Sequence, residues 1–207
     1  MPREDRYADY LGPDGSTTHS LLDAMSNGDD TAWERIALVW GPALVQYFRS
    51  RDLQEADIEE VVQNTLLRMY QGLVKGQFER NGETKRLTYW VYAIAANELK
   101  TYYTRFLNKP NSLGGSTYQQ LLANVETEEE ATTLESLAVT QVLQLIEADF
   151  QKSTWDAFHL RYFDNYALSD IGRKLGISES SVRQGIYRVR QRLKQELMQL
   201  DLFADLN

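Results

Sequence analysis

The chain has 207 residues, 43% of them hydrophobic, and its 30 acidic and 22 basic side chains give a formal net charge of -8. It contains no cysteine, which excludes disulfides, thiolate metal sites and cysteine nucleophiles and fits a reducing cytosol. No apolar run approaches the length of a membrane span, and the opening MPREDRYADYLGPDG lacks the apolar middle of a secretory signal, so we expect a cytoplasmic protein without a membrane span.

The first half of the chain predicts an acidic tail followed by helices. Residues 1–30 carry a net charge of -5, and we expect 1–19 to form a flexible tail. A first helix opens at Thr31 and is expected to break at Gly41-Pro42, where the proline starts a second helix. In ADIEEVVQNTLLRMYQGL, apolar residues recur at helical spacing opposite a polar stripe. After the polar loop KGQFERNGETKR, helical spacing resumes in LTYWVYAIAANELKTYYTRF.

The middle of the chain interrupts this pattern. Residues 108–150 carry a net charge of -6, NKPNSLGGS is rich in turn residues and ETEEE is an acidic run. We therefore expect an acidic linker at 108–135, with helices resuming at about Leu137 and continuing to about Leu200. No stretch predicts a strand. The predicted fold class is all-α, with two small helical domains at 20–107 and 136–200 and a short tail at 201–207.

The stretch LSDIGRKLGISESSVRQGIYRVRQRL is typical of a helix-turn-helix. Gly176 opens a tight turn, and Ser178 is a good N-cap for a helix that starts at Glu179. Helix, three-residue turn and helix form the layout whose second helix enters the DNA major groove. Gly185 costs about 1 kcal/mol relative to alanine inside this helix, and a close approach of the DNA backbone would explain it. The alternative interpretation is an ordinary helical hairpin with a solvated basic face.

The second helix divides into an inward and an outward face. Its expected inward positions are Val182, Ile186, Val189 and Leu193. Residues 179–195 carry five basic side chains and one acidic side chain. In the major groove, arginine can form hydrogen bonds with guanine and glutamine with adenine. The outward positions therefore carry side chains that could recognise bases. Those positions are Ser180, Arg183, Gln184, Tyr187, Arg188 and Gln191.

With both halves in view, the chain resembles the sigma-70 family, in particular its extracytoplasmic-function (ECF) type. ADIEEVVQNTLLRMY is similar to the region 2 helix that binds the polymerase clamp, and LTYWVYAIAANELKTYYTR to the adjoining helix that recognises and melts the -10 element. STWDAFHLRYFDNYALSDIGRKLGISESSVRQGIYRVRQRLKQEL is similar to region 4, which reads the -35 element and touches the polymerase flap. The resemblance covers roughly 20–107 and 137–197. It implies a promoter-specificity subunit that is monomeric when free or inhibited, with core RNA polymerase, promoter DNA and an anti-sigma factor as partners and with no catalytic residues, cofactor or metal.

The resemblance also assigns residues to each role. It implies that core polymerase is contacted by Asp57, Glu60, Gln63, Asn64 and Arg68. It implies that -10 DNA is contacted by Lys85, Arg86, Tyr89, Trp90, Asn97, Lys100 and Arg105, with the loop 77–86 capturing a flipped base. It implies that -35 DNA is contacted by Ser180, Arg183, Gln184, Tyr187 and Arg188. The chain departs from the family at positions that are often charged there, namely Asn64, Ala93, Ala96 and Thr101.

Other interpretations stand beside these roles. Core packing explains Trp90 as well as DNA contact does, and a solvated helix face would explain the acidic residues of the polymerase stripe. The acidic linker resembles the segment that threads through polymerase towards the RNA path, although a plain solvated linker would look the same. A helix-turn-helix regulator that binds operator DNA without joining polymerase is the alternative function. An enzyme is disfavoured because the only histidines are His19 and His159 and no phosphate loop or metal-ligand cluster occurs.

Overall fold

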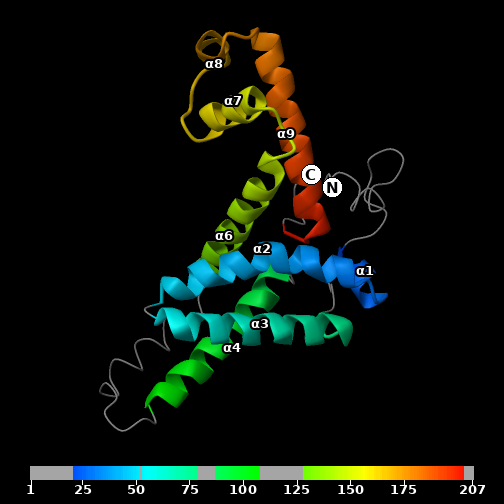
Figure 1. Ribbon diagram of the computed structural model, residues 1–207, viewed down its shortest axis with the longest axis vertical. Coiled ribbons are helices and arrows are strands. Elements are labelled where there is room, and N and C mark those ends of the chain that lie inside the picture. Colours follow the sequence, from blue (N-terminus) through cyan, green and yellow to red (C-terminus); the bar gives the residue numbers. More distant parts are fainter. Residues whose placement is uncertain (1–20, 52, 79–86, 108–127, 203–207) are drawn as a thin grey trace. The chain divides into compact units, whose positions relative to one another are not determined.

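Figure 1 shows the computed structural model of the chain, which describes residues 21–51, 53–78, 87–107 and 128–202. These residues contain eight helices and no strand, which confirms the all-α fold class. The expected tails, the loop residues 79–86 and most of the expected linker lie outside the described residues. In chain order the helices are α1 (Leu21–Ser26), α2 (Asp30–Arg49), α3 (Glu55–Val74), α4 (Leu87–Leu107), α6 (Glu128–Glu147), α7 (Lys152–Tyr162), α8 (Leu168–Leu175) and α9 (Glu179–Gln199).

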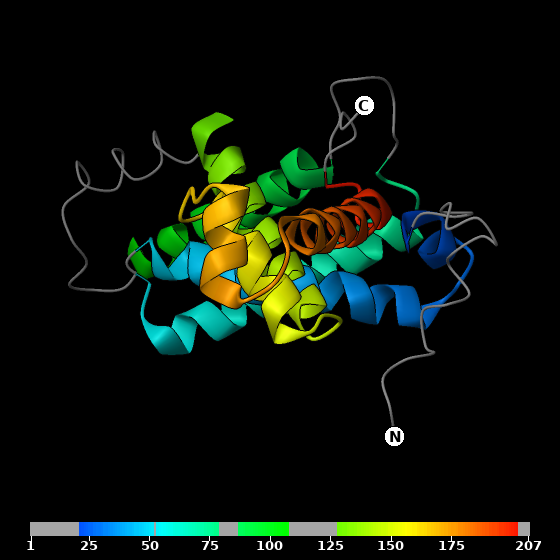
Figure 2. The same ribbon diagram turned by 90° about the horizontal axis from the view of Figure 1, so that it is seen from above.

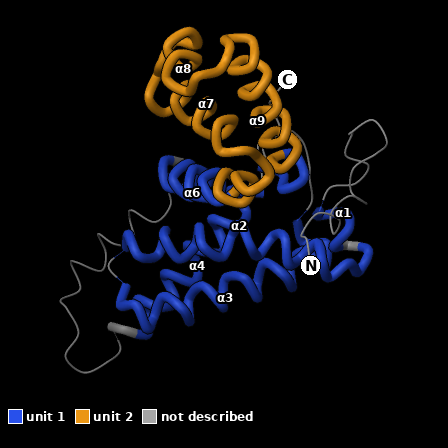
Figure 3. The backbone as a smooth tube through the Cα atoms, turned by 45° about the horizontal axis from the view of Figure 1, so that its top comes forward, with its two compact units in different colours: residues 1–141, 198–205, 207 blue, residues 142–197, 206 orange. Residues whose placement is uncertain are grey.

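The described chain divides into two compact units, which Figure 3 distinguishes by colour. The first unit contains the described residues up to Gln141 and from Met198 onward. The second unit contains Val142–Leu197. The first unit contains α1 to α4 and the first part of α6. The second contains α7, α8 and most of α9. Each unit has its own buried apolar core.

The core of the first unit lies between α2, α3 and α4. Figures 1 and 2 show α2 and α3 side by side, with α4 crossing α3. The helical spacing read from the sequence is confirmed, because its apolar stripes are buried. The buried residues of the stripes of α3 and α4 are Ile58, Val61, Val62, Met69, Leu73, Leu87, Val91, Ala95 and Leu99. Burial of these stripes gives the unit its main stabilisation.

Helix α2 corrects the expected break at Gly41-Pro42, because it runs uninterrupted from Asp30 to Arg49 with the proline inside it. Proline in a helix interior removes one backbone hydrogen bond and costs about 3 kcal/mol. Pro42 is exposed, and its partner carbonyl would be that of Leu38, whose side chain is 48% exposed, so water can reach this turn. Buried side chains on both sides of the proline, including Trp40 and Leu44, hold the helix together by packing.

Two helix boundaries also differ from the sequence interpretation. Helix α1 was not predicted, because its six residues are too few to show a period, yet Leu21 and Met25 are buried. Helix α6 begins at Glu128, well before Leu137, so the C-terminal end of the expected linker is helical. This early start is stabilised within the first unit, where Ala131 and Leu134 are buried.

The second unit packs α7, α8 and α9 around one small core. Figure 2 shows α7 and α8 beside α9. Its central buried residues are Ala157, Leu160, Ile171, Val182 and Ile186, surrounded by Leu168, Leu175 and Ile177. The expected inward face of α9 is confirmed at Val182, Ile186 and Val189, while Leu193 is half-buried.

Candidate nucleic-acid interface

The turn between α8 and α9 is fixed by two glycines. Gly176 ends α8 in the left-handed conformation, with φ 67°, which glycine adopts without a steric penalty. The amides of Gly176 and Ile177 both donate to the carbonyl of Gly172. A Cβ atom on Gly172 would lie 2.9 Å from the Ile177 carbonyl oxygen, so a side chain there would push the turn away. The sequence interpretation identified Gly176 but missed Gly172, which lies inside the helical pattern.

The start of α9 is capped as expected. The Ser181 amide donates to Ser178 Oγ over 3.1 Å, and this bond satisfies one of the free amides of the first turn. Ser178 Oγ also lies 2.8 Å from the hydroxyls of Ser180 and Ser181. The turn and the cap together fix the direction in which α9 leaves α8.

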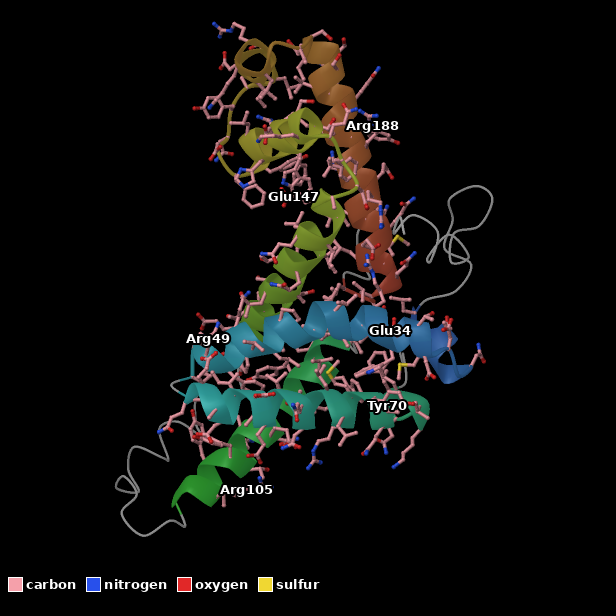
Figure 4. All side chains as sticks on the ribbon, in the orientation of Figure 1. Glu34, Arg49, Tyr70, Arg105, Glu147 and Arg188 are labelled. Carbon is pink, nitrogen blue, oxygen red and sulfur yellow. The ribbon has the colours of Figure 1, made fainter. Side chains whose placement is uncertain are left out.

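All five residues predicted to contact -35 DNA lie on one exposed face of α9. Buried Val182, Ile186 and Val189 define the opposite face, which rests on α7 and α8. Tyr187 is 60% exposed and offers an aromatic ring to a partner. Arg188, labelled on α9 in Figure 4, is exposed as well. The structure therefore brings together Ser180, Arg183, Gln184, Tyr187 and Arg188.

Several basic groups around this face are already paired within the unit. Arg183 Nη2 lies 2.8 Å from Glu179 Oε1, one helical turn before it. On α8, Arg173 forms an ion pair with Asp170. The ammonium group of Lys174 lies 4.6 Å from the centre of the Tyr166 ring. The sequence interpretation counted basic side chains but did not predict which of them would be neutralised.

Two residues of α9 serve packing rather than an outward surface. Arg192 is half-buried, with Nε 3.0 Å from Asp149 Oδ2 and Nη1 2.6 Å from Glu196 Oε1. Gly185 is buried, and a Cβ there would meet the side chain and backbone of Thr154 on α7. The expectation that Gly185 admits the DNA backbone is therefore wrong, because a neighbouring helix occupies that side.

In the first unit, the residues predicted to contact polymerase follow α3. Asp57 and Asn64 are half-buried, whereas Glu60 and Gln63 are exposed. The hydroxyl of Tyr102 on α4 donates to Asp57 Oδ2 over 2.7 Å. Burial, together with the nearby Asp57 carboxylate, raises the pKa of Tyr102 above its ordinary value, so the hydroxyl stays a donor.

Arg68, the last residue of the predicted polymerase stripe, has a structural partner. Its guanidinium forms an ion pair with Glu98 on α4, whose side chain is only 6% exposed. A buried carboxylate without a partner is costly, so this pair ties α3 to α4.

Leu67 and Val74 lie on the exposed side of α3 and were not singled out from the sequence. They extend the stripe of Glu60 and Asn64 at helical spacing.

The residues predicted to contact -10 DNA differ in exposure. Asn97 and Arg105 are exposed on α4, and Tyr89 and Lys100 are half-buried. The ring of Trp90 packs over Gly72, where an added Cβ would lie 2.5 Å from its Cζ2 atom, and near Phe78 with ring centres 5.6 Å apart. Two further predicted residues, Lys85 and Arg86, lie outside the described residues.

One of these -10 residues is bonded to the predicted polymerase stripe. Arg105, labelled near the end of α4 in Figure 4, places Nη1 2.9 Å from Glu60 Oε1. Both side chains are exposed, so the pair is weak and easily exchanged for another partner. The structure thus joins two sites that the sequence interpretation treated as separate.

Comparison with known sequence families finds a match that covers most of the second unit. Residues 153–200 match the family described as Sigma-70, region 4, and this range covers nearly all of α7, all of α8 and α9. The matched range, which contains the helix-turn-helix, is therefore similar to region 4 of sigma-70 proteins, and the match supports a sigma-type or transcription-regulator role. No curated protein matches the chain.

Among the helices that the structure describes, none combines the length and the apolar character needed to cross a membrane.

Proposed function

We propose that the protein is a sigma factor of the ECF type, which joins core RNA polymerase and directs it to promoters. In this proposal α9 reads the -35 element, α4 and the loop before it act on the -10 element, and α3 binds the polymerase clamp. The protein acts in the cytoplasm, has no catalytic activity of its own and is inhibited by an anti-sigma factor.

The observation that carries this proposal is the exposed face of α9 inside a sequence that matches sigma region 4. A glycine turn, a serine cap and an apolar inner face fix the helix, while two arginines, a glutamine and a tyrosine remain on the outside. Side chains of these kinds form hydrogen bonds with the edges of guanine and adenine or with phosphates. The matched range does not include α3 or α4, so their roles rest on the similarity of their own sequence to region 2.

The direct test is transcription by purified core polymerase on a pool of genomic promoter fragments, with and without the full chain. The proposal expects new start sites that depend on the protein and that share two spaced sequence elements. If core polymerase neither bound the protein nor gained start sites, the sigma function would be refuted. Any copurified inhibitor is first removed under mild denaturation and excluded by mass spectrometry.

The clamp contact has its own variant and a matched control. Leu67 lies on the exposed face of α3 and is 53% exposed, and Leu38 on α2 is 48% exposed. Truncating an apolar residue at the centre of an interface commonly costs more than 1 kcal/mol. We therefore expect Leu67→Ala to weaken core polymerase binding by about tenfold and Leu38→Ala to leave it unchanged. Equal affinities for both variants would place the polymerase contact elsewhere.

A regulator that binds operator DNA without joining polymerase is the second candidate. The observation that favours it is that the matched range, 153–200, is the DNA-binding module alone. Regulators of this kind usually dimerise on two half-sites one helical turn apart. Specific binding of a dimer to DNA without polymerase, together with no change in start sites, would favour this candidate.

A further inference from the structure

The first turn of α9 carries an acid where the rest of its outer face is basic or neutral. Glu179 is the first residue of the helix, directly after the Ser178 cap. A carboxylate at this end interacts favourably with the helix dipole, and glutamate four residues before arginine is the favourable order for a helical ion pair. The observed 2.8 Å between Glu179 Oε1 and Arg183 Nη2 agrees with both effects.

In the structure this ion pair places the Arg183 guanidinium beside the Glu179 carboxylate. Arg183 would otherwise move freely, because its side chain is 68% exposed. The bond draws the guanidinium back towards the N-terminal end of α9. In a helix-turn-helix the N-terminal residues of the second helix contact base edges, so this is the end that reads sequence. Held there by one contact, at Nη2, Arg183 keeps its other donors for a base edge.

We propose that Glu179 is a positioning residue that fixes Arg183 for a guanine and thereby determines specificity at one position of the DNA site. The proposal rests on the proposed function only in that α9 must read DNA. The carboxylate acts in two ways. It orients the guanidinium for the bidentate bond to guanine, and it repels phosphate oxygens, which weakens binding to DNA of the wrong sequence.

The chain offers a matched control for this proposal on α7. Lys152 Nζ lies 2.9 Å from Asp156 Oδ2, also an ion pair between residues four apart and also in the second unit. Asp156→Ala therefore removes the same charge and the same kind of bond without touching α9. Glu179→Gln, which retains a weaker neutral acceptor, gives an intermediate between the wild type and Glu179→Ala.

The experiment is selection of bound DNA from a library randomised over the -35 region, using the full chain with core polymerase. We expect Glu179→Ala to reduce the preference for guanine over the other bases at one position by about fivefold. This is the lower end of the discrimination that a bidentate arginine contributes. We expect its binding to non-specific DNA to strengthen, because a repulsive charge is gone. Asp156→Ala should keep the wild-type preference. A general loss of folding would weaken both kinds of binding, so opposite changes distinguish positioning from structural damage.

A second comparison shows whether Glu179 acts through Arg183. In an Arg183→Gln background, Glu179→Ala should no longer change the guanine preference. An unchanged preference in Glu179→Ala alone, or an effect that persists in the Arg183→Gln background, would overturn the proposal. A wild type that selects DNA without gaining start sites would refute the sigma function, and the same variants would still decide the role of Glu179. A wild type that selects no sequence would refute both.

Discussion

Two glycine-to-alanine substitutions in the second unit should change its stability in opposite directions. Gly172→Ala would place a Cβ 2.9 Å from the Ile177 carbonyl oxygen and 3.6 Å from the Glu179 amide nitrogen. Both are backbone atoms of the helix-turn-helix turn, so they cannot move aside as a flexible side chain would. Gly185→Ala would place a Cβ 3.4 Å from Thr154 Cγ2, which is ordinary van der Waals contact.

The magnitudes follow from two opposing effects. Alanine is better than glycine inside a helix by about 1 kcal/mol, and this gain applies to both positions. Forcing an extra methyl group into a packed site costs about 1–3 kcal/mol, and this cost applies only to Gly172. We therefore expect Gly172→Ala to destabilise the unit by about 1 kcal/mol and Gly185→Ala to stabilise it by up to about 1 kcal/mol.

Hydrogen exchange of the full chain measures this difference in the second unit alone. Amides near Ile171 and Val182 lie in its core, and their exchange reports opening of that unit. They should exchange about fivefold faster in Gly172→Ala and more slowly in Gly185→Ala than in the wild type. Because the turn fixes the direction of α9 relative to α8, Gly172→Ala should also weaken DNA binding. Slower exchange in Gly172→Ala, or equal destabilisation by both variants, would refute the packing argument.

Three further predictions concern the first unit, each measured by hydrogen exchange of α3 and α4 in the full chain. Gly72→Ala should destabilise it by about 1–2 kcal/mol, because the new Cβ meets the Trp90 ring 2.5 Å away, and the smaller ring of Trp90→Phe should restore part of the loss. Arg68→Gln should cost about 1–3 kcal/mol at pH 7, because it leaves the buried Glu98 carboxylate without its charge partner, and no loss would show that water already solvates that acid. Tyr102→Phe should cost about 1 kcal/mol at pH 7 through a lost hydrogen bond. Because the folded-state pKa of Tyr102 is raised, the wild type loses this advantage above about pH 10, where the unfolded tyrosine ionises, so a difference that grew with pH would contradict the prediction.

Local sequence patterns predicted the parts of the structure that depend on local physics. The buried stripes of α3 and α4 follow from helical spacing, and the turn at Gly176 with its cap at Ser178 follows from residue type. These features depend on residues within one or two helical turns. A single sequence contains that information directly.

Features that depend on tertiary packing were not predictable in the same way. Pro42 indicated a break, but buried side chains on both sides of it keep α2 continuous. Some ion pairs of the candidate sites join residues far apart in the chain, such as Glu60 with Arg105. Composition shows that charges are present, but only the arrangement of helices shows which of them meet.

The exposure of each acidic partner separates two arginines that we propose contact DNA from two that hold the fold. Arg68 and Arg192 pair with carboxylates that are 6% and 4% exposed, so removing either arginine would leave a buried charge. Arg105 and Arg183 pair with carboxylates that are 60% and 49% exposed, and such pairs contribute about 0–1 kcal/mol. Because these pairs are weak, both arginines can also bond to DNA in the proposed function at little cost. In a chain with a net charge of -8, an acid beside each of these arginines weakens their attraction to phosphates in general, while Arg183 keeps its other donors for a base edge.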